Sequence, residues 1–456
     1  MTDMPVSNPP GAPTGGWTAR VWRLVIPIVL SNLSTPLIGA VDTAVVGHLP
    51  DPAYIGGVAL GALIFSFLYW GFGFLRMGTT GFAAQAYGAG DRTELQATLL
   101  RPLILAAALG ALLILLQMPI RVVALSLLTA SDEVEALAHA YYDVRIWSAP
   151  AALANYALLG WLLGTQRART ALIVQLVLNG ANAALDLLFV IGLGWGIVGV
   201  ALASVLAEYG AAVLGLAIAF RIFIRTGGDR SGRQGGARRE QARLWRRERL
   251  VALFRVNGDI FVRTICLIFA FGYFTAQGAR MGDVPLAANA ILMHLQQFAA
   301  YGLDGFAHAV EILAGGAVGA RSRDAFRAAV RTSTVWALGA AAAMAGIYAL
   351  LGPSIIGLFT GIDEVRRVAI LYLPWLVLSP VVSVWSFQLD GIFIGATRTA
   401  EMRNAMIFSL AVFLPACWIL VPLLDNHGLW LAFTLFMLVR AMSLGAFYSR
   451  LERSLG

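Results

Sequence analysis

The sequence predicts an all-α polytopic membrane protein whose twelve transmembrane helices form two parallel repeats of six. The first observation is composition: 59% of the 456 residues are hydrophobic and only 13% are charged, whereas soluble domains contain about 25% charged residues. The second is a series of twelve apolar segments, each long enough to cross a bilayer. The third is a pair of motifs that recurs at one fixed distance along the chain.

Each predicted span contains about 20 mostly apolar residues, the number that a helix needs to cross the hydrocarbon core. In the first half of the chain the spans are expected at residues 21–49, 55–78, 99–119, 136–163, 168–191 and 197–224. In the second half they are expected at residues 250–277, 286–310, 325–351, 369–394, 402–424 and 428–450.

Arginine positions set the predicted orientation, because positively charged connections tend to stay in the cytosol. One set of connections contains Arg92, Arg101, Arg167, Arg169, Arg321, Arg323, Arg398 and Arg403. The opposite connections are short and poor in arginine, with Arg366 and Arg367 as the main exceptions. Both termini lie on the arginine-rich side, so we expect a multi-pass protein of the inner membrane with both ends in the cytosol.

Two polar stretches delimit the predicted lobes. Residues 1–20 are expected to form a disordered cytosolic tail, followed by an N-terminal six-helix lobe at 21–224. Residues 225–249 contain nine arginines and three acidic residues, which is +6 of the formal net charge of +8. We expect this stretch to be a cytosolic linker to a C-terminal six-helix lobe at 250–456. Because the excess charge lies in one loop of a membrane protein, no nucleic-acid partner is expected.

The internal repeat rests on two motifs that share one offset in residue number. The stretch Gly88–Arg92 (GAGDR) recurs as Gly319–Arg323 (GARSR), so the offset is 231. The stretch Gly160–Gly164 (GWLLG) recurs at the same offset as 391–395 (GIFIG). One offset for two separated motifs indicates duplication of a six-span unit, an arrangement common in secondary transporters, where substrate binds between the halves.

All 33 basic residues are arginine, which excludes several mechanisms. A nucleotide-binding P-loop needs a lysine on the phosphates, and Schiff-base chemistry needs a lysine amine. The two cysteines, Cys266 and Cys417, both lie in apolar runs and give no metal or disulfide framework. We therefore expect no cofactor, no resident metal and no self-contained ATP-driven pump.

Buried polar residues of the first half predict a cation site. Asp42 lies in the first span and Asp186 in the fifth, both about 9–10 Å inside the outer surface at the 1.5 Å rise of a helix. Asn179, Asn182 and Asp186 share one helix face, and Ser204 of the sixth span reaches the same depth. Such an oxygen-rich cluster can bind a proton or Na⁺. Alternatively, it ties helices together, or Arg76 or Arg145 neutralises one of its acids.

The second half contains a different set of buried charges. Its candidate gate or substrate-path residues are Asp304, Glu311, Asp390 and Arg263. Arg263 matches Asp304 in depth, and Arg255 matches Glu311, so ion pairing is the simpler explanation of these charges. Pro27 of the first span is a candidate hinge, because proline can kink a helix.

Several segments resemble the multidrug and toxic compound extrusion (MATE) family. The likeness lies in Pro27, in residues 39–48 (GAVDTAVVGH) and in residues 182–186 (NAALD). Residues 303–311 (LDGFAHAVE) and 388–397 (QLDGIFIGAT) are similar to the DinF-like branch of that family. The resemblance extends over residues 22–452.

The resemblance implies a V-shaped, two-lobed antiporter that exports organic cations or amphiphilic drugs in exchange for H⁺ or Na⁺. By position, Asp42, Asn182, Asp186 and Ser204 correspond to the cation-coupling site of the N-terminal lobe. In another branch the coupling acid lies in the seventh span, where this chain has Asp259 only near the cytosolic end. Because this chain lacks an acid deep in the seventh span, coupling through the N-terminal lobe is favoured.

The expected partners are the small-molecule substrate, the coupling ion and membrane lipids, and the protein is expected to be a monomer. An enzyme is not expected, because the sequence shows neither a zinc-hydrolase motif nor a set of nucleophile and base. The alternative is a flippase for a lipid-linked precursor from the same superfamily. Relatives of that kind usually have fourteen spans and a cationic cavity, whereas this chain has twelve spans and an acidic cluster.

Overall fold

The computed structural model describes residues 14–49, 51–127, 130–226 and 245–455, and all regular elements within these ranges are helices. The predicted all-α fold class is therefore confirmed. Contacts divide the chain into two compact units. The N-terminal unit consists of Leu30–Asn257, and the C-terminal unit consists of the described residues up to Val29 together with those from Gly258 onwards.

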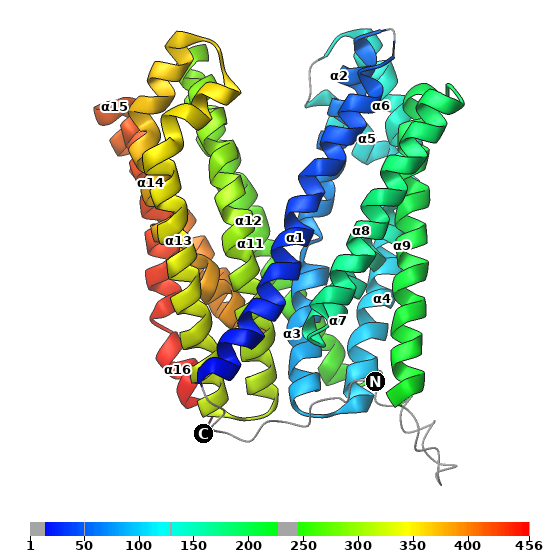
Figure 1. Ribbon diagram of the computed structural model, residues 1–456, viewed down its shortest axis with the longest axis vertical. Coiled ribbons are helices and arrows are strands. Elements are labelled where there is room, and N and C mark those ends of the chain that lie inside the picture. Colours follow the sequence, from blue (N-terminus) through cyan, green and yellow to red (C-terminus); the bar gives the residue numbers. More distant parts are fainter. Residues whose placement is uncertain (1–13, 50, 128–129, 227–244, 456) are drawn as a thin grey trace. The chain divides into compact units, whose positions relative to one another are not determined.

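The N-terminal unit is built from helices of the first half of the chain, coloured blue to green in Figure 1. Helix α1 (Thr14–Val46) begins before the expected Val21 and passes from the C-terminal into the N-terminal unit between Val29 and Leu30. The others are α2 (Ala53–Gly71), α3 (Phe74–Gly88), α4 (Arg92–Leu115), α5 (Gln117–Ser126), α6 (Asp132–Arg145), η1 (Ile146–Ser148), α7 (Ala149–Gly164), α8 (Ala168–Asp186), the π-helical η2 (Leu187–Gly192) and α9 (Gly196–Thr226).

The C-terminal unit contains fewer and longer helices. Helix α11 (Arg247–Arg280) enters this unit at Gly258, and most of the Arg-rich linker that precedes it lies outside the described residues. The others are α12 (Asp283–Gly319), α13 (Arg323–Phe359), α14 (Asp363–Gly395), α15 (Thr399–Gly445) and α16 (Tyr448–Arg453). Non-helical backbone at Asp425 divides the 47 residues of α15 into two segments.

Every predicted span corresponds to one helix or to two or three consecutive helical elements, although the first predicted span runs three residues beyond the end of α1 at Val46. Nine helical segments of the described chain are long and apolar enough to cross a membrane. The break at Asp425 makes α15 two of the predicted spans, and α1 and α12, with 33 and 37 residues, supply two more. Most helices extend beyond the predicted ends, because hydropathy detects only the apolar part of each. The short helix α5 was not predicted.

Turns confirm the internal repeat residue by residue. Positive φ angles occur at Gly90 (67°) and at Arg321 (52°), two positions related by the repeat offset. They occur again at Gln166 (60°) and Thr397 (54°), with the same offset. After the first pair of turns, Asp91 and Ser322 cap the next helix by accepting hydrogen bonds from the backbone N–H groups of Glu94 and Ala325.

Glycine motifs of the repeat form matched helix contacts. In the N-terminal unit, a Cβ atom at Gly160 of α7 would overlap the carbonyl oxygen of Arg76 in α3. In the C-terminal unit, a Cβ atom at Gly391 of α14 would overlap the carbonyl oxygen of Ala307 in α12. Arg76 and Ala307 are themselves related by the repeat offset, so both halves use one backbone-to-backbone contact that only glycine permits.

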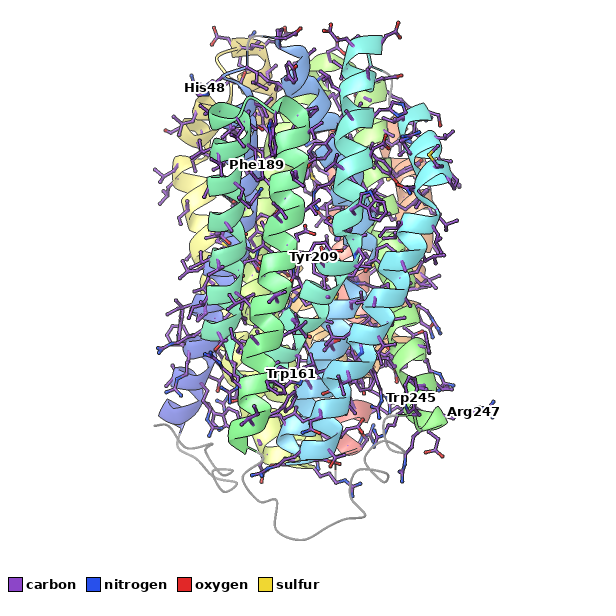
Figure 2. The ribbon with its side chains drawn as sticks, turned by 90° about the vertical axis from the view of Figure 1, so that its right-hand side faces the viewer. His48, Trp161, Phe189, Tyr209, Trp245 and Arg247 are labelled. Carbon is purple, nitrogen blue, oxygen red and sulfur yellow. The ribbon has the colours of Figure 1, made fainter. Side chains whose placement is uncertain are left out.

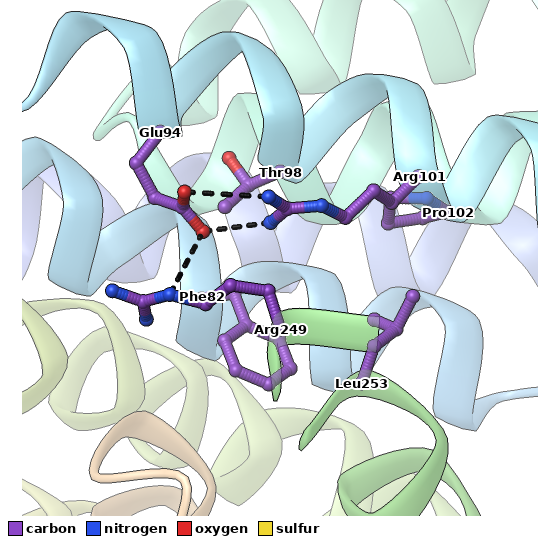
Figure 3. A pocket seen from close by; sticks show the side chains of 7 residues that line it. All are labelled: Phe82, Glu94, Thr98, Arg101, Pro102, Arg249 and Leu253. Atoms are coloured by element: carbon purple, nitrogen blue, oxygen red, sulfur yellow. Dashed lines mark hydrogen bonds and ion pairs between the residues drawn. The ribbon is translucent and has the colours of Figure 1, made fainter. Parts of the chain in front are cut away.

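Polar contacts of α4 hold it against α7 and against the beginning of α11 in the N-terminal unit. Trp161, labelled in Figure 2, is buried and donates its indole N–H to the carbonyl oxygen of Leu95 at 3.0 Å. In the pocket of Figure 3, the Glu94 carboxylate accepts two hydrogen bonds from Arg101, at 2.7 and 3.4 Å. The Nε atom of Arg249 lies 3.9 Å from the same carboxylate, which attaches the first turn of α11 to α4.

Candidate functional site

Polar side chains of three helices meet inside the N-terminal unit. Helix α8 supplies Asn182 and Asp186, whose side chains are one turn apart and hydrogen-bonded at 3.0 Å. The Nδ2 atom of Asn182 also lies 3.4 Å from the Oγ atom of Ser204 in α9. Asp42 of α1 completes the group, and its carboxyl group interacts directly with that of Asp186. The structure thus brings together four of the five residues proposed for cation coupling.

Asn179 lies one turn away from this group and has other partners. It donates through Nδ2 to the Oγ atom of Ser34 at 2.8 Å and accepts a hydrogen bond from Gln175 at 2.9 Å. This side chain ties α8 to α1. We call the other four residues, Asp42, Asn182, Asp186 and Ser204, the coupling cluster, after the role that the sequence predicts for them.

The two acids of the coupling cluster are buried, with exposed fractions of 8% for Asp42 and 0% for Asp186. Two negative charges so close together and so poorly hydrated are costly to bury, so the pair favours a bound proton or cation. The Oδ1 atoms of both acids accept no hydrogen bond from the residues that the structure describes. The cluster therefore has free oxygen acceptors and a charge to neutralise, which are the two requirements of a proton or Na⁺ site.

An ion pair lies beside the cluster, and only its arginine was named from the sequence. The Arg145 guanidinium, considered above as a neutralising group, acts electrostatically on both acids of the cluster. Its direct partner is Glu208 of α9, at 2.5 Å, a residue that sequence reasoning missed. Its spacing from Ser204 was a usable signal, because residues four apart share one face of a helix.

Charged residues of the C-terminal unit form a separate network. Arg263 and Arg440 both donate to the Oδ2 atom of Asp390, and all three are buried. The sequence placed Arg263 and Asp304 at one depth, and the structure shows in addition an ion-pair network that joins α11 to α14 and α15. Arg440 was missed, because depth along a span does not show which neighbouring helix a side chain faces.

The remaining candidates of the C-terminal unit have partners of their own. The Oε2 atom of Glu311 lies 2.9 Å from Nδ1 of His308, one turn earlier in α12. Asp259 accepts hydrogen bonds from Arg403 at 2.6 Å and from Thr399 at 3.0 Å. No group of three metal-ligating side chains occurs among the described residues.

Glu452 near the C-terminus also pairs with two arginines, but these arginines are partly exposed. Its Oε1 atom lies 3.1 Å from Arg323 and 2.5 Å from Arg327. Loss of hydration works against ionisation, but the hydrogen bonds and charges of Arg327 and Arg323 hold the pKa of Glu452 below its usual range. Both arginines are more than one-third exposed, so we expect this triad to contribute little to stability.

We expect Asp390→Asn to destabilise the protein strongly, and Glu452→Gln only weakly. The first change leaves two buried guanidinium groups without their shared carboxylate, a loss of about 3–5 kcal/mol for broken buried pairs. The second loses about 0–1 kcal/mol, because solvent screens the exposed partners. Thermal unfolding of both variants in detergent measures the difference, and equal midpoints would contradict the assignment of Asp390 to a buried network.

The fold and the coupling cluster define the class of protein. Internal repeats of several membrane-spanning helices are characteristic of secondary transporters. The chain is accordingly a multi-pass membrane transporter.

Known proteins give the family. Residues 27–188 and 260–419 match the MatE family model. DNA damage-inducible protein F of Escherichia coli (strain K12) is 44% identical, over 94% of this chain and 92% of its own length. A solved structure of MATE in the bent conformation is similar at a TM-score of 0.84, with 22% identity over 97% of each chain. The chain belongs to the MatE family, and the resemblance to MATE transporters and their DinF-like branch is confirmed.

A second solved structure supports the same fold. An outward-facing multidrug resistance MATE family transporter of the MOP superfamily is similar at a TM-score of 0.81, with 21% identity over 96% of each chain. The two regions matched by the family model end at positions 188 and 419, which are related by the repeat offset. The family model therefore matches once in each repeat, and members of the family are transport proteins.

Proposed function

We propose that the protein is a secondary active antiporter that exports organic cations or amphiphilic drugs in exchange for H⁺ or Na⁺. The observation that carries this proposal is the buried pair Asp42–Asp186 with its amide and hydroxyl neighbours. A buried acid pair is costly in a membrane protein and is the kind of group that binds a coupling cation.

The restriction of this cluster to one repeat supports a single coupling site. At the offset of 231, its four residues correspond to Tyr273, Phe413, Cys417 and Leu435. Phe413 and Cys417 belong to the apolar core of the C-terminal unit, and Tyr273 packs against it. The polar residues are therefore not needed to fold a six-helix unit of this type.

In the proposed cycle, an incoming H⁺ or Na⁺ binds the outward-open protein at Asp42 or Asp186. Neutralising the pair changes the packing of α1 against α8, which releases the exported substrate. The empty protein then turns inward, as in other repeat-built transporters. A membrane potential contributes about 2.3 kcal/mol per charge for each 100 mV.

Other residues have proposed supporting roles. Pro27 lies two residues before the point where α1 leaves the C-terminal unit, and we propose it as the hinge of that helix. Asp304, Glu311, Asp390 and Arg263 are proposed as gate or substrate-path residues of the C-terminal unit. The protein is proposed to act as a monomer in the inner membrane, with both termini in the cytosol.

Proteoliposomes with separately imposed gradients test the coupling. We expect a pH gradient or a Na⁺ gradient, but not an unenergised membrane, to drive transport of the lipophilic cation ethidium. The gradient that drives transport identifies the coupling ion. Absence of transport under both gradients, together with flipping of a labelled lipid, would overturn the proposal in favour of a flippase.

A further inference from the structure

The Arg145–Glu208 pair is the second buried charge system of the N-terminal unit. Besides Glu208, the Arg145 guanidinium donates to the Oγ atom of Ser148. It lies 5.5 Å from the ring centre of Phe65 and 5.7 Å from that of Tyr69. Both side chains of the ion pair are only 12% exposed. The aromatic rings and the ion pair hold the guanidinium in one place inside the helix bundle.

The ion pair is adjacent to the coupling cluster. Ser204, a member of that cluster, lies one turn before Glu208 on the same face of α9. The guanidinium interacts with Asp42 and Asp186 through space, and it hydrogen-bonds to the phenol of Tyr141. Arg145 thus pairs directly with Glu208, and its charge also acts on the two acids of the coupling cluster.

More acidic than basic side chains surround Arg145. Carboxyl groups come from three helices: Asp42 from α1, Asp186 from α8 and Glu208 from α9. The other ionisable groups around the pair are phenols, from Tyr69, Tyr141 and Tyr156. Arg76 of α3 acts on Tyr156. When all three carboxyl groups are ionised, their negative charge exceeds the positive charge of the Arg145 guanidinium that faces them, and a bound cation reduces this excess.

The pair has no counterpart in the other repeat. At the offset of 231, Arg145 corresponds to Leu376 and Glu208 to Val439. Leu376 is fully buried in the apolar core of the C-terminal unit. The ion pair therefore occurs in the same unit as the coupling cluster, and the six-helix fold does not require it.

We propose that Glu208 holds the charge of Arg145 away from Asp42 and Asp186 and thereby sets the affinity of the coupling cluster for its cation. The inference rests on the proposed antiport function and deepens it. A guanidinium close to two carboxylates competes with H⁺ or Na⁺ for them. While Glu208 neutralises Arg145, that competition is weak; without Glu208 it is strong. Arg145 and Glu208 are positioning residues that act through the cluster.

Charge-neutralising variants test this inference through the cation dependence of transport. Ethidium transport is measured in proteoliposomes against the concentration of the coupling ion. We expect Glu208→Gln to raise the half-maximal concentration about tenfold, and Arg145→Gln to lower it about tenfold, the effect of one unit charge at short range. The double variant, which removes both charges, is expected to return to the wild-type value.

The double variant also separates a positioning role from a structural one. A pair that only stabilises the bundle would change the maximal rate or the folded yield and leave the half-maximal concentration unmoved. Glu94→Gln is a matched control, because Glu94 is also paired with a buried arginine of the N-terminal unit. It is expected to leave the half-maximal concentration unchanged.

Outcomes distinguish this inference from the proposed function. If Asp42→Asn is inactive but folded Glu208→Gln shows the wild-type half-maximal concentration, the role of the ion pair is overturned and antiport stands. If Asp42→Asn transports like the wild type, the proposed coupling site itself is overturned. Opposite shifts for the two single variants, cancelled in the double variant, support the inference.

Discussion

Asp42→Asn is expected to reduce gradient-driven export to the level of empty vesicles while leaving the protein folded. Asparagine has nearly the same shape as aspartate, so the packing of the buried side chain is kept. It carries no negative charge and takes up no proton in the physiological range. The pair with Asp186 then holds a single carboxyl group, and the alternation between cation-bound and cation-free states is lost.

The measurement is ethidium transport under an imposed gradient, with wild-type protein reconstituted at equal density. Asp363→Asn is the matched control, because it makes the same chemical change at an exposed residue in the first turn of α14. We expect the control to transport at the wild-type rate. Retained transport by Asp42→Asn, with normal thermal unfolding, would show that the coupling cation binds elsewhere.

The elements of the fold could be predicted because a bilayer imposes a simple requirement on sequence. A spanning helix needs about 20 apolar residues, and that signal located all twelve spans. Helix ends were less accurate, since α12 continues to Gly319 although its predicted apolar span ends at Val310. The repeat was visible in the sequence because its close helix contacts need glycine at equivalent positions, as at Gly160 and Gly391.

Which helices pack side by side could not be predicted in the same way. Depth along a helix is readable from sequence, and it correctly placed Asp42, Asp186 and Ser204 at one level. Which helices lie side by side depends on packing between segments far apart in the chain. For that reason Glu208 and Arg440 were missed, and so was the ion pair between Arg263 and Asp390.

Substitution of the repeat glycines is expected to lower the stability of both units. We expect Gly391→Ala and Gly160→Ala to lower the thermal midpoint in detergent. The added methyl group would overlap a backbone carbonyl oxygen in each case, that of Ala307 or of Arg76. Backbone atoms of a packed helix cannot rotate away as a side chain can, so the helices must separate. Overpacking of this kind costs about 1–3 kcal/mol.

Two other glycines serve as controls for the same substitution. At Gly180 of α8 and Gly339 of α13, an added methyl group would have no atom of another segment within 4 Å, so Gly180→Ala and Gly339→Ala add no clash. Alanine is favoured over glycine in a helix by about 1 kcal/mol, so these variants should match or exceed the wild-type midpoint. Because Gly160 and Gly391 occupy equivalent positions, equal losses are expected. A loss at one position alone would show that the two six-helix units do not depend on the same contact.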